Sequence, residues 1–550
     1  MSLRAPAVVE TDVLVLGGGL AGHRAAIAAR EAGAAVDLVY LGSGASPGVI
    51  CFNVPLGVED SRDSEAAYAE DMLRGGYQLN DRALVEVLAA GTKAALVELE
   101  KIGVEFARRE GRHAQRHLAG SRYPRSVYSP EGLGPSGLRR MDARCRELGV
   151  RVHQGWKVIA LLREEDEVAG ALAVQRRSGD LLSVHARAVV LAMGGIGRLY
   201  EDSTYPVDVG ADAYALAFDA GARLVDMEFV QFEPTVTVWP DGCRGMEMPT
   251  AMLGDGAHLK NAGGERFMFR YNADHGEKRI EKARMSLCIQ REIDEGRGLP
   301  DRAVLFDTTV VPPDRLESYT SHCKRLRKAG LEPTREGPHV RPAAHSHMGG
   351  VWIDRDGWSG IPGLWAGGEA AGGVHGASRL AGNSGSDILV FGARAGRGAA
   401  AGARTVALDR PWASMEGTAL EGLAAALARD HGTAPEDIKQ AVRRTMSRAA
   451  GLYRDHDGLA DGLRELERLQ RQVDTGLQGR GVDEAVATLE AGNMVLVARM
   501  IVTAALARTE SRGAHQRTDH PQQDDAQWLR HLVVSRGRDG AVDLGASPAG

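Results

Sequence analysis

The sequence is poor in cysteine and in aromatic residues. Its 550 residues include only five cysteines and 5% aromatics, and no two cysteines form a CxxC pair. Zinc and iron–sulfur sites are built from clustered cysteine ligands. We therefore expect no metal site built from this chain alone, and a reducing environment such as the cytoplasm.

The chain also lacks a targeting segment, a long apolar run and a strong net charge. The N-terminal MSLRAPAVVE has no apolar core of signal-peptide length. No window approaches the ~18 apolar residues of a membrane span. A net charge of −6 gives no electrostatic case for nucleic acid or an anionic membrane. We expect a soluble, cytoplasmic protein that binds no nucleic acid and has no membrane span.

What the chain has in abundance is glycine, and near the N-terminus it is placed for nucleotide binding. An apolar run at 12–16 predicts a buried strand, and an Ala-rich helix is expected at 20–32. Gly17, Gly19 and Gly22 form a GxGxxG motif between the two. These glycines allow the turn, the approach of backbone to a pyrophosphate and close packing of the helix. The unit therefore predicts a dinucleotide site.

The second strand of this unit, expected at 36–41, ends without the acid that normally binds the ribose hydroxyls. Tyr40 or Leu41 stands in that place. No basic residue replaces the acid, so NADP is not favoured. We expect the Tyr40 hydroxyl, Ser43 or the backbone to recognise the ribose.

The length of the chain predicts two or three domains, because 550 residues exceed one hydrophobic core. Residues 188–193 predict another buried strand, which Gly194 and Gly195 turn sharply. From about 235 to 340 the β pattern is lost, which indicates an inserted domain. Helical patterns dominate after Trp412.

The run from Gly349 to Asn383, GGVWIDRDGWSGIPGLWAGGEAAGGVHGASRLAGN, carries the most information. Together with GGGLAGHRAA near the start, it resembles the flavoprotein family of succinate dehydrogenase, fumarate reductase and L-aspartate oxidase. The resemblance implies an α/β fold: a Rossmann-like FAD-binding domain split by an inserted α+β capping domain, followed by a C-terminal helical domain. The expected ranges are 5–234 and 341–405 for FAD binding, 235–340 for the cap, 410–535 for the helical domain and 536–550 for a flexible tail.

The resemblance also implies how FAD is held. Glu369 would contact ribityl or ribose hydroxyls, while Asn383 and Ser384 would lie near the isoalloxazine ring at a helix start. Family members with covalent FAD use a histidine, and residues 43–53 contain none, so the FAD should be non-covalent. The expected cofactor residues are Gly17, Gly19, Leu20, Ala21, Gly22, Tyr40, Ser43, Ala192, Gly194, Gly195, Asp212, Gly368, Glu369, Arg379, Gly382, Asn383 and Ser384.

Three positions match the catalytic set of the family. His345 corresponds to a histidine that hydrogen-bonds a substrate carboxylate, and Arg379 to the arginine whose planar fork clamps it. Arg284 falls where the family has its proton-transferring arginine. The structural alternatives are a core histidine, a helix cap or structural ion pair, and a plain surface arginine, respectively.

Two departures from the family concern the substrate. The Phe-His-Pro-Thr of the family is Phe-Glu-Pro-Thr here, with Glu233 and Thr235 at the site, and its acidic Thr-Glu-Gly segment is missing near Met248–Leu253. In a dry pocket an acid at 233 would repel the second carboxylate of a dicarboxylate. We expect a monocarboxylate, or an acid with an amine or hydroxyl that Glu233 accepts from. Alternatively, Glu233 pairs with a pocket arginine and a normal dicarboxylate site remains.

The resemblance thus predicts an FAD-dependent oxidoreductase that exchanges hydride with a carbon adjacent to the carboxylate of a small organic acid. One alternative is an amino acid oxidase resembling L-aspartate oxidase. Another is the flavoprotein subunit of an electron-transfer complex with a ferredoxin-like or iron–sulfur partner, because GVICFNVPLG is similar to adenylylsulfate reductase flavoproteins. A third is an FAD-bound protein without catalysis.

Overall fold

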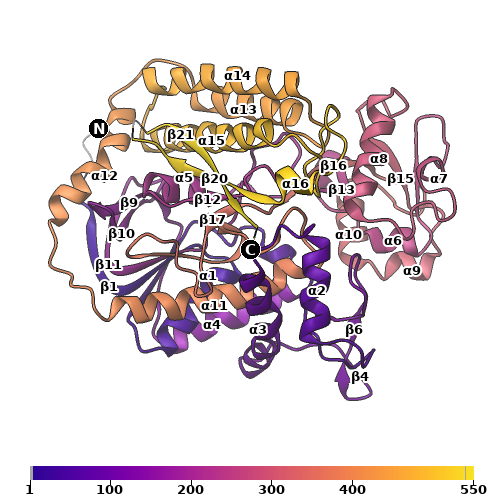
Figure 1. Cartoon of the computed structure of the whole chain (residues 1–550), viewed down its shortest axis with the longest axis horizontal. Coiled ribbons are helices and arrows are strands. Elements are labelled where there is room, and N and C mark those ends of the chain that lie inside the picture. The colour runs from indigo at the N-terminus through magenta and orange to yellow at the C-terminus, as the bar shows by residue number, and fades with distance from the viewer. Residues whose placement is uncertain (1–3, 539, 550) are drawn as a thin grey trace.

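The computed structural model describes residues 4–538 and 540–549, and a mixed sheet forms the centre of its first domain (Figure 1). The strand order is β8-β2-β1-β11-β10-β9, and β18 pairs with β11. The first four strands and β18 are parallel, whereas β9, β10 and β11 form an antiparallel meander. The bounds are β1 Ala7–Leu16, β2 Val36–Tyr40, β8 Arg151–Gln154, β9 Lys157–Glu164, β10 Glu167–Val174, β11 Leu181–Leu191 and β18 Leu364–Ala366.

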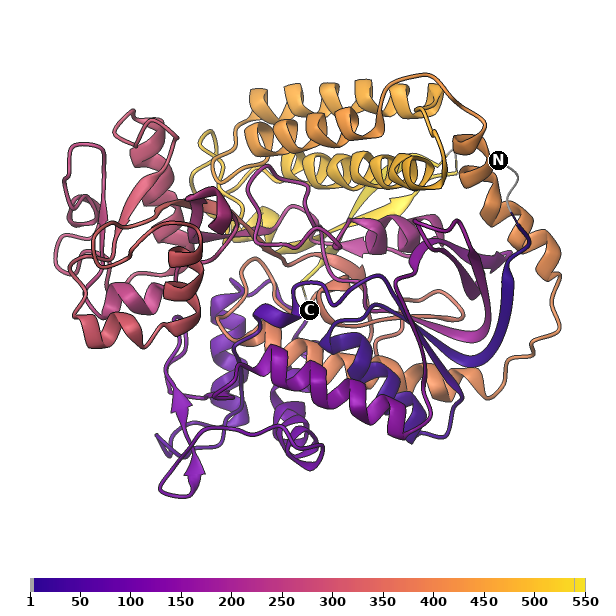
Figure 2. The ribbon, with the colours of Figure 1, turned by 180° about the vertical axis from the view of Figure 1, so that it is seen from behind.

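A layer of helices covers one face of this sheet (Figure 2). Helices α1 and α11 run side by side in the same direction: a Cβ on Gly392 would lie 2.8 Å from the Ala21 carbonyl oxygen, and one on Gly396 would lie 2.1 Å from that of Ala25. The two helices therefore present their positive N-terminal ends on the same side of the molecule. The bounds are α1 Leu20–Glu31, α2 Glu65–Gly75, α3 Arg82–Lys101, α4 Leu133–Glu147 and α11 Asn383–Ala403. Helix α5, Asp212–Asp219, lies on the opposite face of the sheet (Figure 1).

A smaller arm of short strands projects below this layer in Figure 1. Strands β3, β7 and β6 form one antiparallel sheet, and β4 pairs with β5. The bounds are β3 Cys51–Asn53, β4 Arg108–Arg109, β5 Arg112–His113, β6 Gln115–Arg116 and β7 Ser126–Tyr128.

The capping domain stands apart at one end of the molecule (Figure 1) and has a core of its own. Its sheet has the order β13-β16-β15-β14. The bounds are β13 Val230–Trp239, β14 His258–Lys260, β15 Val304–Asp307, β16 His339–His347, α6 Thr250–Gly254, α7 Met268–Tyr271, α8 Lys282–Asp294, α9 Pro313–Glu317 and α10 Thr320–Lys328. The predicted boundaries at 234 and 341 fall inside β13 and β16, so these two strands lead directly from the FAD-binding domain into the cap.

The C-terminal region is helical, as expected, and packs on the opposite side of the sheet from α1 and α11 (Figures 1 and 2). The bounds are α12 Trp412–Leu427, α13 Pro435–Ala449, α14 His456–Thr475, α15 Val482–Ala507 and α16 Asp525–Trp528. The predicted fold class is confirmed.

Residues 536–550 were expected to form a flexible tail, and this prediction is wrong for most of them. Strand β21, Val542–Pro548, pairs along its whole length with β20, Arg530–Arg536. The two extend a five-stranded sheet of order β19-β17-β12-β20-β21, whose other strands are β12 Leu224–Val225, β17 Gly350–Trp352 and β19 Ala371–Gly372. Small and polar residues can form this strand because its pairing with β20 uses only backbone hydrogen bonds. Its Val542 and Leu544 side chains pack against the core.

Helix α15 corrects a second expectation, that no segment is apolar enough to cross a membrane. By length and composition Val482–Ala507 passes that test. In the fold it lies against α13 and α14 (Figure 2), and Val495, Ile501 and Val502 are fully buried there. This is the environment of a core helix in a globular domain.

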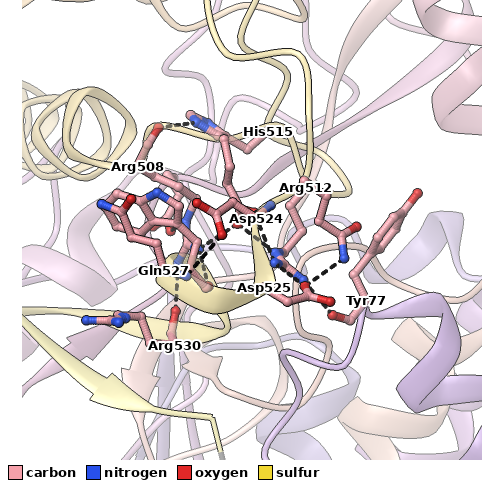
Figure 3. A network of polar contacts seen from close by, with 12 residues as sticks. Tyr77, Arg508, Arg512, His515, Asp524, Asp525, Gln527 and Arg530 are labelled. Atoms are coloured by element: carbon pink, nitrogen blue, oxygen red, sulfur yellow. Dashed lines mark hydrogen bonds and ion pairs between the residues drawn. The ribbon is translucent and has the colours of Figure 1, made fainter.

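A buried ion-pair network ties the C-terminal region to the first domain (Figure 3). The Arg508 guanidinium donates to Glu228 at 2.6 Å and to Glu510 at 3.0 Å, and all three side chains are fully buried. Arg512 also donates to Glu510, at 2.6 Å, and reaches the backbone carbonyl of Tyr77 at 3.0 Å. Buried charges of this kind are stable only while each keeps its partner.

We therefore expect Arg508→Met to destabilise the protein by about 3–5 kcal/mol, because Glu228 and Glu510 would lose a buried counter-charge. The measurement is the midpoint of thermal unfolding. Arg468→Met is the control, since Arg468 pairs with Glu465 on an exposed face and should cost at most about 0.5 kcal/mol. Equal midpoints for both variants would contradict this account of the interface.

Candidate functional site

The glycine motif at the end of β1 forms a cradle that no larger residue fits. Gly17 has φ +122°, and a Cβ there would lie 2.1 Å from the Ala192 carbonyl oxygen. A Cβ on Gly22 would lie 1.8 Å from the Gly17 carbonyl oxygen. The cradle thus brings β1, α1 and the turn after β11 together, as the motif predicted.

The start of α1 has a partner that sequence reasoning missed. Gly19, Leu20 and Ala21 open the helix, and the Leu20 amide donates to the Ser46 hydroxyl at 2.9 Å. Ser46 follows the second strand by six residues, in a loop where only Ser43 was singled out. Ser46 lies outside the glycine motif, so the motif gave no reason to single it out.

The ribose end of the cradle contains an acid from a distant loop. The Tyr40 ring lies against Gly18, where a Cβ would meet it at 2.3 Å. The Asp208 carboxylate accepts from the Gly44 amide at 3.0 Å. Asp208 therefore places a carboxylate beside the loop that follows β2, a strand that ends without an acid. A local motif could not identify Asp208, because it lies 164 residues away along the chain.

The segment Gly367-Gly368-Glu369 packs against the turn that follows β11. A Cβ on Gly195 would lie 2.7 Å from the Glu369 carboxyl carbon, and one on Gly368 would lie 2.8 Å from the Ala21 methyl. Glu369 accepts from the backbone amide of His347 at 2.8 Å and from the Tyr205 hydroxyl. Burial raises the pKa of Glu369.

Asp212 is the predicted cofactor residue whose side chain is engaged elsewhere. It accepts from the Lys157 ammonium at 2.8 Å and from the Asn493 amide at 2.7 Å. These contacts join α5 to the sheet and to α15, so its carboxylate serves the domain interface.

The second helix start, at α11, is held from the other side. Gly382 has φ +86° and precedes Asn383 and Ser384 in the first turn. The Asn383 amide oxygen accepts from Asn53 at 2.7 Å and from the Tyr68 hydroxyl at 2.6 Å. Neither Asn53 nor Tyr68 was predicted as a site residue: Asn53 lies in the GVICFNVPLG stretch but was given no role there, and Tyr68 lies in no motif.

These segments fit FAD. Two parallel helices, α1 and α11, start at the site. Its glycines leave no room for side chains, and Ala192, Gly194 and Gly195 form the turn that follows β11. Helix N-termini and glycine backbone are suited to a pyrophosphate.

A cluster of charged side chains lies on the cap side of the site. The Lys282 ammonium donates to both carboxylate oxygens of Glu233 at 2.8 Å and to Glu247 at 3.2 Å. Lys282 is the first residue of α8, and Glu233 lies on β13. Carboxylate oxygens of Glu233 and Glu247 and a ring nitrogen of His345 lie within 4.8 Å of one another.

This spacing would also suit a metal ion, but the Lys282 ammonium already lies between the two carboxylates. The charges shift one another strongly. Burial raises the pKa of Glu233 to about 8. Burial acts in the same direction on Glu247, but the Lys282 ammonium outweighs it and lowers the pKa of Glu247 to about 2. Burial opposes the charge of Lys282, yet both carboxylates together raise its pKa.

His345 and Arg379 adjoin this cluster. Burial lowers the pKa of His345 to about 4, so its imidazole is neutral near pH 7. Its Nδ1 lies 3.0 Å from the Thr204 hydroxyl. Arg379 donates through Nε to the Ser346 hydroxyl at 3.3 Å.

The structure does not bring Arg284 to this cluster. Arg284 is exposed and lines a surface hollow with Leu287 and Tyr453. It lies two residues after Lys282 on α8, about 200° around the helix. The cation that meets Glu233 is therefore Lys282.

Two further expectations change at this site. The Thr235 hydroxyl is buried and donates to the Met248 carbonyl at 2.8 Å, so it supports the strand. The acidic segment expected to be missing near Met248–Leu253 has a counterpart one residue earlier, in Glu247. The alternative that Glu233 pairs with a pocket arginine is correct in that Glu233 has a cationic partner. The partner, however, is Lys282, which Glu247 also contacts.

Comparison with known proteins agrees with this architecture. A family model described as "FAD binding domain" matches residues 12–384, and one described as "Fumarate reductase flavoprotein C-term" matches residues 439–549. The chain is 32% identical to a subunit of the fumarate reductase (CoM/CoB) of Methanothermobacter marburgensis, over 96% of this chain and 97% of the relative. It is 35% identical to L-aspartate oxidase of Caulobacter vibrioides, over 96% of each.

Solved structures show the same fold. Sdh1 of Mycobacterium smegmatis, in complex with UQ1, superposes with a TM-score of 0.88 at 32% identity, covering 98% of this chain and 94% of the other. Adenylylsulfate reductase of Archaeoglobus fulgidus superposes with a TM-score of 0.81 at 19% identity, over 99% and 96%, which is a likeness of fold alone. The chain belongs to the family of FAD-dependent oxidoreductases that includes fumarate reductase, the succinate dehydrogenase flavoprotein and L-aspartate oxidase.

Proposed function

We propose that this protein exchanges hydride between FAD and a carbon adjacent to the carboxylate of a small organic acid. The observation that carries the proposal is the Lys282 ammonium, held by Glu233 and Glu247 beside His345 and Arg379. A proton carrier, a carboxylate clamp and a polar donor thus share one partly buried site.

The reaction interconverts R–CH2–CH2–COO⁻ and R–CH=CH–COO⁻. In the oxidising direction one carbon loses a hydride and its neighbour loses a proton. When bound, FAD would supply the two-electron chemistry for the exchange of that hydride. The protein must therefore hold the carboxylate and move the second proton.

Arg379 is suited to hold the carboxylate. Its planar guanidinium offers parallel N–H donors to two oxygens, and only the Ser346 hydroxyl engages its Nε. His345 adds a neutral imidazole, which can polarise the same carboxylate or an adjoining oxygen without adding charge.

Lys282 is suited to move the proton. Its two carboxylates keep it an ammonium, so in the reducing direction it is ready to donate to carbon. Glu233 holds a proton near neutral pH and lies 2.8 Å away, so it can return a proton to the amine. In the oxidising direction these transfers run in reverse. The resting ammonium favours reduction as the direction of turnover.

As the partner that exchanges electrons with the flavin we propose a separate ferredoxin-like or iron–sulfur protein. The relative from Methanothermobacter marburgensis is named as one subunit of a reductase, whereas the relative from Caulobacter vibrioides is named as an oxidase. Within residues 4–538 and 540–549, the five cysteines are unpaired and none takes part in a metal-binding group. Electrons that reach the flavin, or leave it other than to the acid, therefore need an external partner.

FAD should be bound without a covalent link, because residues 43–53 offer no histidine for attachment. After acid precipitation of the purified protein, we expect all the yellow flavin in the supernatant. Flavin that stays with the precipitate and fluoresces on a denaturing gel would contradict this.

Two substitutions on the same helix test the proton carrier. Lys282→Ala should lower turnover with an enoic acid by about 10²–10⁴-fold while FAD stays bound, because it removes the group that donates to carbon. Arg284→Ala should stay within about twofold of wild type, because its side chain points to solvent. The measurement is the anaerobic rate at which the acid reoxidises the reduced flavin. A large loss in Arg284→Ala with little change in Lys282→Ala would reverse the assignment.

A further inference from the structure

The number of unneutralised cations in the site limits the substrate, provided that the proposed function holds and the acid binds here. Lys282 is one of the two cations of the cluster, and it is fully engaged: both oxygens of Glu233 lie at 2.8 Å and Glu247 lies at 3.2 Å. One ammonium shared by two carboxyl groups leaves a net charge of zero when Glu233 is protonated and of −1 when it is not. In neither state does this group of three attract an anion.

His345 adds no positive charge to the site. Its imidazole is half-buried, and the nearby Arg379 and Lys282 act with this burial to keep it neutral. It can therefore offer a hydrogen bond to the substrate but no counter-charge.

Arg379 is the cation that remains available. In the part of the chain that the structure describes, no carboxylate lies within ion-pair distance of its guanidinium, and its one side-chain partner is the Ser346 hydroxyl. One guanidinium fork matches one carboxylate. A second carboxylate on the substrate would have to face Glu233, whose side chain is only 2% exposed. An ionised Glu233 would repel that carboxylate strongly, and a protonated Glu233 would still leave it without a counter-charge.

We infer that the natural substrate carries one carboxylate, bound by Arg379, and at its other end a hydrogen-bond donor that faces Glu233. A hydroxyl or an ammonium group at the end of a four-carbon acid has this chemistry. Glu233 is then the residue that determines specificity, because its carboxyl oxygens accept from a donor and give an anion no counter-charge.

The test compares four-carbon acids that differ only at the far end: 4-hydroxybutanoate, 4-aminobutanoate, butanoate and succinate. Binding is titrated anaerobically through the change in the absorbance spectrum of the oxidised flavin, which reports binding whether or not electrons move. We expect the two donor-ended acids to bind at least about tenfold more tightly than succinate, with butanoate between them. The same order is expected for 4-hydroxycrotonate, crotonate and fumarate.

Glu233→Gln removes the charge that Glu233 carries when it is ionised and keeps the size, so it should reduce the preference over succinate to about threefold or less. Glu465→Gln, on the exposed face of α14, is the matched control and should leave the preference unchanged. The comparison of ligands on the wild-type protein does not depend on whether either variant folds.

The outcomes separate the two proposals. Binding of succinate or fumarate as tight as that of the donor-ended acids overturns the inference, and bleaching of the flavin by succinate would at the same time support the proposed function. Binding in the expected order, with no acid reducing or reoxidising the flavin, supports the inference and overturns the proposed function. If no acid of either class changes the spectrum, both are overturned.

Discussion

The ammonium of Lys282, shared by Glu233 and Glu247, is the interaction on which the site depends. A buried carboxylate is costly unless a cation and hydrogen bonds compensate it. Here one cation serves two acids at 2.8 and 3.2 Å. Burial raises the pKa of Glu233 to about 8, whereas the ammonium outweighs burial at Glu247 and lowers its pKa to about 2. In the proposed mechanism Lys282 is then the proton donor, and Glu233 is the group that returns a proton to it. Because Lys282 is engaged by two carboxylates, it is not available to bind a carboxylate of the substrate.

The rest of the fold delivers groups to this point. Helices α1 and α11 start on the same side because Gly392 and Gly396 let them pack in parallel, and their N-termini are suited to the cofactor. Strands β13 and β16 run on from the first domain into the cap, so Glu233 and His345 come from paired strands while α8 brings Lys282. The C-terminal network around Arg508 then fixes the loop before β13 through Glu228 (Figure 3).

The sequence predicted the features whose cause is local and missed those that arise from tertiary contacts. The glycine cradle, the fold class and the positions of His345 and Arg379 followed from short motifs. Lys282 was missed because Arg284, two residues on, matched the expected residue type, and only the helix geometry turns Arg284 away. Asp208 reaches the nucleotide loop from 164 residues away. Strand β21 was missed because its residues carry almost no β pattern and pair through backbone alone.

The measurement that tests the central claim most directly is chemical rescue of Lys282→Ala by small primary amines. The truncated side chain leaves space between Glu233 and Glu247, where methylammonium or ethylammonium can take the place of the lost ammonium. If Lys282 is the proton donor, the rate at which an enoic acid reoxidises the reduced flavin should rise with amine concentration and reach a plateau. Wild-type protein should not respond. A Lys282→Ala variant that keeps its full rate without added amine would contradict the account.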